Sequence, residues 1–198
     1  MSLPSLLLFD LGGVLVENTG FEDLNRLLPQ PLESAALKSQ WLKSPAVRRF
    51  ELGVTTAVEF TAEFIAEWGI DAQPDTFLAA FFSWPKGFFP QARELLEALR
   101  QRYRVGCLSN ANALHWQKFE GFRGVFDIAL SSHLLGAIKP DRDAFERALA
   151  ECDAAPNKVY FFDDSLPNVL GAEDVGMRSF HVEGIDAVKT VLAREGLI

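Results

Sequence analysis

Short apolar runs separated by helical segments constrain the fold of this chain most strongly. They predict five strands, at residues 5–9, 104–109, 125–130, 158–162 and 178–182. Strands that are apolar on both faces are typical of parallel sheets with helices packed on each side, because neither face then meets water. The sequence therefore predicts an α/β fold in which helices cover both faces of a parallel sheet.

Amphipathic segments between the later runs predict the covering helices. Residues 91–102 and 141–150 carry apolar side chains at helical spacing. Residues 165–175 begin at Ser165, which we expect to be an N-cap, and stop before a glycine. We interpret these three segments as helices that connect successive strands.

Residues from about 17 to 85 interrupt this alternation. The segment has no convincing strand and is typical of several short helices. The clearest lies in TTAVEFTAEFIAEWGI, with Thr55 or Thr56 as its N-cap. We predict a core domain of residues 1–16 and 86–198, interrupted by a helical cap domain of residues 17–85.

Composition excludes several classes of function. The net charge of −8 argues against a broad basic surface for nucleic acid. Cys107 and Cys152 form no disulfide framework or zinc spacing, and we expect both thiols to be buried. The apolar run after Met1 is short, lacks a basic region and ends at Asp10, unlike a signal peptide or a membrane span. We therefore predict a cytoplasmic protein that binds neither nucleic acid nor membranes.

Four of the predicted strands are followed by side chains that could meet a phosphate or a metal ion. In chain order they are Asp10, Ser109 with Asn110, Lys139, and Asp163 with Asp164. Taken singly, each has a plainer interpretation, such as a strand end, a turn or an acid pair at a helix N-terminus. Ligands of open parallel sheets collect at the carboxyl ends of the strands, so the common placement of these residues favours one site.

This set of residues suits phosphoryl transfer. A carboxylate such as Asp10 can attack phosphorus and form an aspartyl-phosphate, which divides one difficult displacement into two easier steps. Carboxylates, including Asp163 and Asp164, are the oxygen ligands that Mg²⁺ prefers. Lys139 would add a second positive charge, and the Ser109 hydroxyl would donate a hydrogen bond to a phosphoryl oxygen.

The motifs resemble those of the haloacid dehalogenase-like hydrolase superfamily over essentially the whole chain. FDLGGVL, CLSN, IKP and FFDDSLPN are similar to its first, second, third and fourth motifs. The chain most resembles small bacterial phosphatases with a helical cap after the first motif (subfamily I), including the branch that acts on sugar phosphates such as glucose 1-phosphate. The resemblance implies a three-layer, Rossmann-like core, a helical cap, and magnesium-dependent hydrolysis of a small-molecule phosphate ester.

The resemblance also implies a role for each matching residue. Asp10 would be the nucleophile, while Ser109 and Lys139 would take part in catalysis by binding the phosphate. Asn110 and Gly12 would complete the phosphate site. The metal ligands would be Asp10, the Gly12 carbonyl, Asp164 and, beside it, Asp163.

The chain departs from the family pattern at Gly12. Most phosphatases of the superfamily have a second Asp there, which protonates the leaving oxygen and then activates water. General acid–base catalysis typically contributes about 10² to 10⁴ in rate. Glu17 is a candidate replacement, and His115 could face the pocket, although a solvated linker carboxylate and a surface helix residue are the plainer interpretations.

Three functions stay open on the sequence. The first is a phosphatase that uses another acid or a metal-bound water, as members of the sugar-phosphatase branch with Gly at this position suggest. The second is a 2-haloacid dehalogenase, a class that also lacks the second Asp but works without metal and typically has neutral residues in place of the acidic pair. The third is a non-catalytic module that binds phosphate ligands. The pair Asp163–Asp164 favours the phosphatase.

Overall fold

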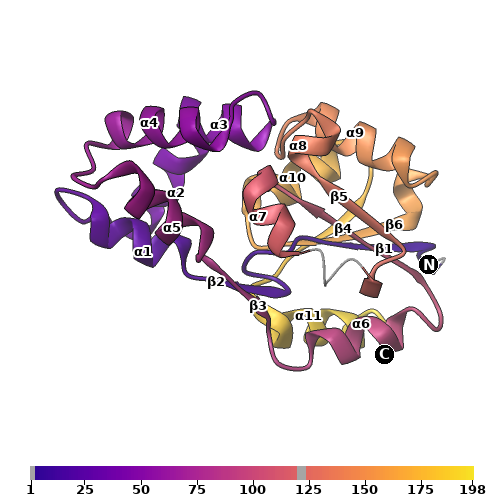
Figure 1. Cartoon of the computed structure of the whole chain (residues 1–198). Helices are drawn as coiled ribbons and strands as arrows, with labels where there is room; N and C mark the ends of the chain where they lie inside the picture. The colour runs from indigo at the N-terminus through magenta and orange to yellow at the C-terminus, as the bar shows by residue number, and fades with distance from the viewer. Residues whose placement is uncertain (1–2, 120–123) are drawn as a thin grey trace.

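A parallel sheet lies at the centre of the computed structural model, which describes residues 3–119 and 124–198 (Figure 1). Its strand order is β5-β4-β1-β6-β7, and every neighbouring pair is parallel. The strands are β1 (Leu6–Phe9), β4 (Arg104–Ser109), β5 (Ile128–Ser131), β6 (Val159–Asp163) and β7 (Arg178–His181). The predicted parallel sheet is confirmed, with its third strand in chain order beginning at Ile128 rather than at residue 125.

Helices cover both faces of this sheet, as Figure 1 shows. The segments that follow the cap region are α6 (Ala92–Leu99), α7 (Ala113–Lys118), α8 (Ser132–Leu135), α9 (Arg142–Glu151), the 3₁₀ turn η2 (Pro156–Lys158), α10 (Leu166–Asp174) and α11 (Gly184–Arg194). The three predicted helices correspond to α6, α9 and α10. Ser165 occupies the N-cap position of α10, although its side chain makes no capping hydrogen bond.

The alternation of side chains along each strand produces two hydrophobic layers. In β1, Leu7 and Phe9 belong to a buried cluster that includes residues of α6 and α11. Leu6 and Leu8 belong to a second cluster on the other face, with residues of α9 and α10. Both faces are therefore dry, which explains why the strands are almost wholly apolar and confirms the three-layer α/β arrangement.

Five helices lie between β2 (Val16–Asn18) and β3 (Pro85–Phe88) in the chain and pack beside the sheet (Figure 1). They are α1 (Gly20–Leu27), α2 (Ser34–Lys43), α3 (Pro45–Glu51), α4 (Ala57–Trp68) and α5 (Pro74–Phe82). We call this group the helical cap. It has its own aromatic cluster, in which the Phe50 and Phe60 rings stack with centroids 4.3 Å apart. Helix α4 begins with a capping box, so Thr56 rather than Thr55 is its N-cap.

Two short strands connect the helical cap to the sheet, and the expectation of no strand in this region is wrong there. Strand β2 (Val16–Asn18) pairs antiparallel with β3 (Pro85–Phe88), so the outgoing and returning chains run side by side. Pro85 and Gly87 are poor strand formers, and strands of this length have no detectable periodicity, so no local pattern predicts these two strands. The exact domain division stays a prediction, and residues 1–2 and 120–123 of the predicted core lie outside the described residues.

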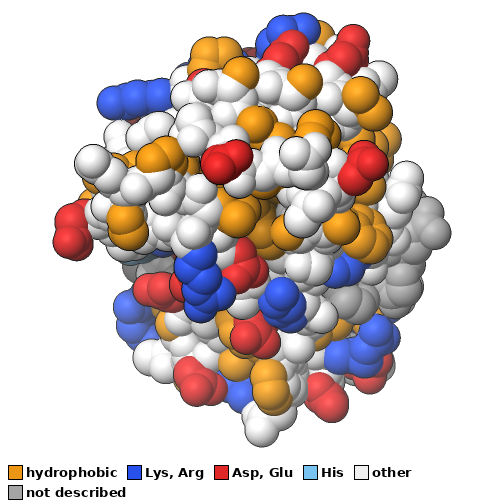
Figure 2. Space-filling view, turned by 60° about the vertical axis from the view of Figure 1, so that its left-hand side comes forward, with side chains coloured by type: hydrophobic (Ala, Val, Ile, Leu, Met, Phe, Trp, Pro, Cys, Tyr) orange, Lys and Arg blue, Asp and Glu red, His pale blue; other side chains and the backbone are white. Residues whose placement is uncertain are grey.

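Charged side chains lie on the face drawn in Figure 2, and both cysteines lie in the core, as expected. On the face drawn in Figure 2, Lys and Arg side chains are interspersed with Asp and Glu side chains rather than gathered in a basic surface. Within residues 3–119 and 124–198, no helix combines the length and apolar character needed to cross a membrane. Cys107 and Cys152 are both buried, and burial raises the pKa of the first thiol to about 12 and of the second to about 11.

Candidate active site

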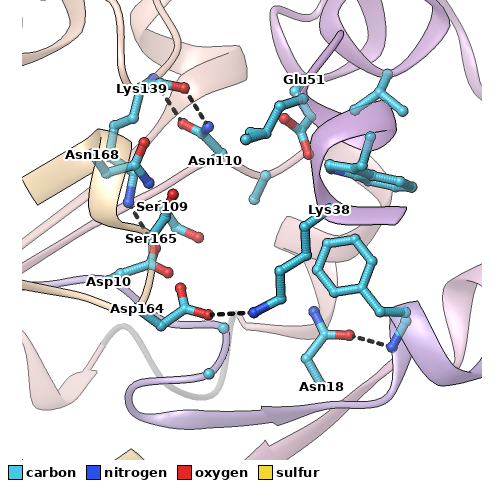
Figure 3. A pocket seen from close by; sticks show the side chains of 18 of the residues that line it. Asp10, Asn18, Lys38, Glu51, Ser109, Asn110, Lys139, Asp164, Ser165 and Asn168 are labelled. Carbon is cyan, nitrogen blue, oxygen red and sulfur yellow. Dashed lines mark hydrogen bonds and ion pairs between the residues drawn. The ribbon is translucent and has the colours of Figure 1, made fainter. Parts of the chain in front are cut away.

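Strands β1, β4 and β6 are neighbours, and their carboxyl ends bring the predicted residues together (Figure 3). Asp10 directly follows β1, Ser109 ends β4, and Asp163 ends β6. All three are buried, with exposed fractions of 8%, 5% and 0%. Buried polar groups at strand ends are costly unless they are paired, so this edge of the sheet must satisfy them internally or with a ligand.

Lys139 lies at the centre of this polar group. Its Nζ donates to Asp163 Oδ2 at 2.7 Å, to the Leu108 carbonyl at 2.7 Å and to Asp10 Oδ1 at 2.9 Å. Burial by itself lowers the pKa of the Lys139 ammonium, but the charges of Asp10 and Asp163 outweigh it and raise this pKa above its ordinary value. The lysine is therefore a fixed positive charge next to the Asp10 carboxylate.

Asp10, Asp163 and Asp164 form a cluster that fits a divalent cation. Each offers a carboxylate oxygen, and these oxygens lie within 4.8 Å of one another. Burial raises the pKa of Asp10 even though Lys139 opposes this, and Asp163 and Asp164 raise it further. Burial also raises the pKa of Asp164, and Asp163 adds to that effect. A single lysine charge bonded to two of three crowded carboxylates leaves negative charge that a cation would neutralise.

The two oxygens of Asp163 already have partners within the protein. Oδ1 accepts hydrogen bonds from the Ser165 backbone N–H at 2.8 Å and from Asn168 Nδ2 at 3.0 Å, while Oδ2 pairs with Lys139. Asp164 is more open, and its Oδ2 lies 3.9 Å from Lys38 Nζ, which reaches it from α2 (Figure 3). Asp164 is therefore the more available of the acidic pair.

Ser109 and Asn110 differ in what their side chains can still bind. Among the described residues, the Ser109 hydroxyl makes no hydrogen bond, so it is available to a ligand. The Asn110 amide instead holds the backbone of Lys139: its Oδ1 accepts from the Lys139 N–H at 2.9 Å, and its Nδ2 donates to the Lys139 carbonyl at 2.8 Å. Asn110 thus fixes the lysine, and its predicted phosphate contact stays a prediction.

The two glycines after Asp10 are constrained differently. Gly13 has φ +74°, and a Cβ there would lie 2.7 Å from Asp164 Oδ2. Only glycine fits this close approach without displacing the carboxylate. A Cβ on Gly12 would meet only Asn18 Nδ2, at an ordinary 3.5 Å. Position 12 therefore has room for a side chain, although the residue there is glycine.

A cavity of roughly 660 Å³ lies between this site and the helical cap. Its core side includes Asp10, Ser109 and Lys139. The helical cap contributes apolar residues to the lining, namely Phe21, Trp41, Leu42 and Val47, and Trp84, between α5 and β3, adds to them. A small organic molecule could thus place a charged end on the strand ends and its remainder against an apolar wall.

The polar residues of the cavity that the sequence analysis did not predict include Asn18, Lys38 and Glu51. Only Glu51 left a signal in the sequence. It shares the buried side of α3 with Val47 one turn earlier, so it is a charged residue on an apolar helical face.

The structure separates the two secondary candidates: Glu17 lies outside the cavity, whereas His115 is among the residues that line it. Glu17 is exposed on β2 and does not line the cavity, so it is unsuited to replace the missing acid. His115 is buried rather than on the surface: its Nε2 lies 2.8 Å from the Phe81 carbonyl, and burial lowers its pKa to about 4. A neutral His115 therefore links α7 to the helical cap.

Comparison with known families gives one match that covers most of the chain. The sequence model of the haloacid dehalogenase-like hydrolases matches residues 4–176. This range includes all four predicted motifs and the whole helical cap.

Individual proteins similar to this chain include a phosphatase from Mycobacterium tuberculosis, which is 28% identical over 190 residues that cover 90% of this chain and 87% of that protein. Among solved structures, an enzyme from Bacteroides thetaiotaomicron in complex with magnesium and inorganic phosphate matches with a TM-score of 0.72 and 22% identity, covering 90% of this chain and 93% of the other. A dehalogenase matches with a TM-score of 0.68 and 19% identity, covering 98% and 97%. At these identities the structural matches indicate a common fold.

Proposed function

Because this chain belongs to the haloacid dehalogenase-like hydrolase family, we propose that it is a magnesium-dependent phosphatase of small-molecule phosphate esters. The single observation that carries the proposal is the buried arrangement of Asp10, Lys139 and the acidic pair at adjacent strand ends. The acidic pair favours phosphatase over dehalogenase chemistry, since three clustered carboxylates call for a cation. The similar phosphatase from Mycobacterium tuberculosis adds support.

In this mechanism, Asp10 attacks the phosphorus atom and forms an aspartyl-phosphate, which water then hydrolyses. Lys139 holds one Asp10 oxygen through the hydrogen bond of 2.9 Å and leaves the other to attack. The Ser109 hydroxyl donates a hydrogen bond to a phosphoryl oxygen. Asp10, Asp164 and the Gly12 carbonyl would hold Mg²⁺, with Asp163 beside them, and the ion would supply positive charge for two anions to approach each other.

The helical cap would hold the alcohol part of the ester. It would limit the access of bulk water to the phosphoenzyme. A cavity of roughly 660 Å³ suits a metabolite and would exclude a phosphorylated protein surface. Sugar phosphates such as glucose 1-phosphate are within this size and remain our first candidates.

The proposal is tested by assaying the purified protein on p-nitrophenyl phosphate and on a panel of sugar and nucleotide phosphates, with Mg²⁺ and with EDTA. We expect turnover with Mg²⁺, loss of turnover with EDTA, and loss of turnover in Asp10→Asn. Phosphate release that survives either change would contradict the mechanism.

The same assay separates the other two functions. Phosphate binding without turnover of any ester would favour a non-catalytic module. Chloride release from a 2-haloacid, undiminished by EDTA, would favour a dehalogenase.

A further inference from the structure

The missing acid beside Gly12 can be sought among the carboxylates that line the cavity. In the described part of the chain these are Asp10, Glu22, Glu51, Asp164 and Glu183. Asp10 and Asp164 belong to the nucleophile and metal cluster. Glu22 and Glu183 are exposed to water, whereas Glu51 is only 8% exposed. Glu51 is thus the buried acid of the cavity that the mechanism above does not use.

Contacts between the helical cap and the core hold Glu51 above the strand ends. It is the last residue of α3, and its backbone carbonyl accepts a hydrogen bond of 2.6 Å from Ser132 Oγ at the start of α8. The following turn is equally close to the core, since a Cβ on Gly53 would lie 3.1 Å from the His133 carbonyl. The Glu51 carboxyl points into the cavity from the cap side, opposite the side of Asp10 (Figure 3).

The Glu51 carboxyl has no fixed partner in the described chain: no hydrogen bond or ion pair there engages it. The charges of Lys139 and Asp10 act on the Glu51 carboxyl from the core. Three further titratable groups belong to α3 and its neighbouring helices: Arg48 lies one turn earlier on α3, Lys38 lines the same cavity from α2, and His133 lies on α8. Arg48 is paired with Asp141. A buried, unpaired carboxyl is costly in its charged form, which favours the protonated acid.

The shift in the pKa of the Glu51 carboxyl agrees with this geometry. Burial raises the pKa of Glu51 to about 8, with Lys139 opposing the rise and Asp10 adding to it. The carboxyl is therefore mostly protonated at neutral pH and can lose its proton when negative charge develops nearby. General acids work best when their pKa lies near the working pH.

We propose that Glu51, delivered by the helical cap, is the general acid and base that replaces the side chain absent at Gly12. This inference rests on the proposed phosphatase function. In the first step Asp10 forms a bond to phosphorus, the bond to the ester oxygen breaks, and the Glu51 proton passes to that oxygen to release an alcohol. In the second step Glu51 takes a proton from water, the oxygen of that water bonds to phosphorus, and the bond to Asp10 breaks, which releases phosphate and restores both carboxyl groups.

The leaving group provides a test that a merely structural role would not pass. A series of substituted phenyl phosphates keeps the shape of the substrate while the basicity of the departing phenolate changes. For each member kcat/KM is measured with Mg²⁺ for the wild type and for Glu51→Gln. We expect kcat/KM to fall by about 10²- to 10⁴-fold for phenyl phosphate and alkyl phosphates, which need a proton. For p-nitrophenyl phosphate, whose phenolate departs unaided, we expect a loss below about tenfold, with the phosphoenzyme accumulating as a burst of nitrophenolate.

Glu22→Gln is the matched control, because Glu22 is a cap carboxylate that lines the same cavity but is exposed. It should leave the leaving-group dependence of the wild type unchanged. Equal losses for all phenyl phosphates in Glu51→Gln, with or without a lower Tm, would overturn the inference and indicate a binding or structural role. Failure of the wild type to hydrolyse any ester would instead refute the proposed function, and this inference with it.

Discussion

Replacing Lys139 by Met should destabilise the protein more than any other single change at the site. The substitution keeps an unbranched apolar stem and removes only the ammonium group. Asp163 and Asp10, whose side chains are 0% and 11% exposed, would then lack their cation. Breaking a buried ion pair by removing one partner typically costs about 3–5 kcal/mol, because the remaining charge is buried and unpaired. For a chain of this size that corresponds to a fall in Tm of about 6–20 °C.

Urea unfolding in EDTA at pH 8 and pH 5 measures this cost without bound metal. We expect a smaller loss at pH 5. The pKa of Asp10 is already raised by burial, and removing Lys139 raises it further. A carboxyl with a raised folded pKa binds its proton more readily in the folded state, so its penalty appears as pH rises and is relieved as pH falls.

The double variant Lys139→Met with Asp163→Asn should lose less free energy of unfolding than the two single variants together, by at least about 1 kcal/mol. The reason is that Asp163→Asn removes one of the carboxylates that Lys139→Met leaves buried and unpaired. Lys189→Met is the control, since Lys189 pairs with the exposed Asp186 and should cost at most about 1 kcal/mol. A loss for Lys139→Met no larger than this control, or strict additivity in the double variant, would refute the reasoning.

Further predictions concern the glycine turn after β1, the contact of His115 with the helical cap, and the N-terminus of α4. Gly13→Ala should lower stability by about 1–2 kcal/mol through its positive φ and weaken Mg²⁺ binding by displacing Asp164, whereas Gly12→Ala should do neither; unfolding curves and metal titration compare the two. His115→Gln should make the free energy of unfolding depend less on pH in acid. In the wild type, a buried histidine with a pKa of about 4 lowers this free energy by up to about 3 kcal/mol as pH falls from 6.5 toward 4. Equal pH slopes for the two proteins would contradict this. Thr56→Ala should cost about 1 kcal/mol by removing the capping box of α4, as measured by urea unfolding.

The sequence predicts those site residues that stand at the end of a strand. Asp10, Ser109 and Asp163 each follow or end an apolar run, and parallel strands must meet at one edge, so their proximity follows from sequence order. Lys139 was also predictable, since it comes just after the third run. What the sequence could not show was that Asn110 would be used to fix the Lys139 backbone, because that depends on how two loops meet.

The sequence by itself determined the parallel sheet, its helical layers and the group of polar residues at its edge, because hydrophobic periodicity and chain order are local properties. Tertiary structure alone decided the rest. Glu17 follows Asp10 closely in the chain, yet it is exposed on β2. Glu51 is 41 residues beyond Asp10 in the printed sequence, yet it lines the same cavity, because α3 docks through its backbone against Ser132. Proximity between the helical cap and the strand ends depends on packing between separate elements, which no local pattern of residues records.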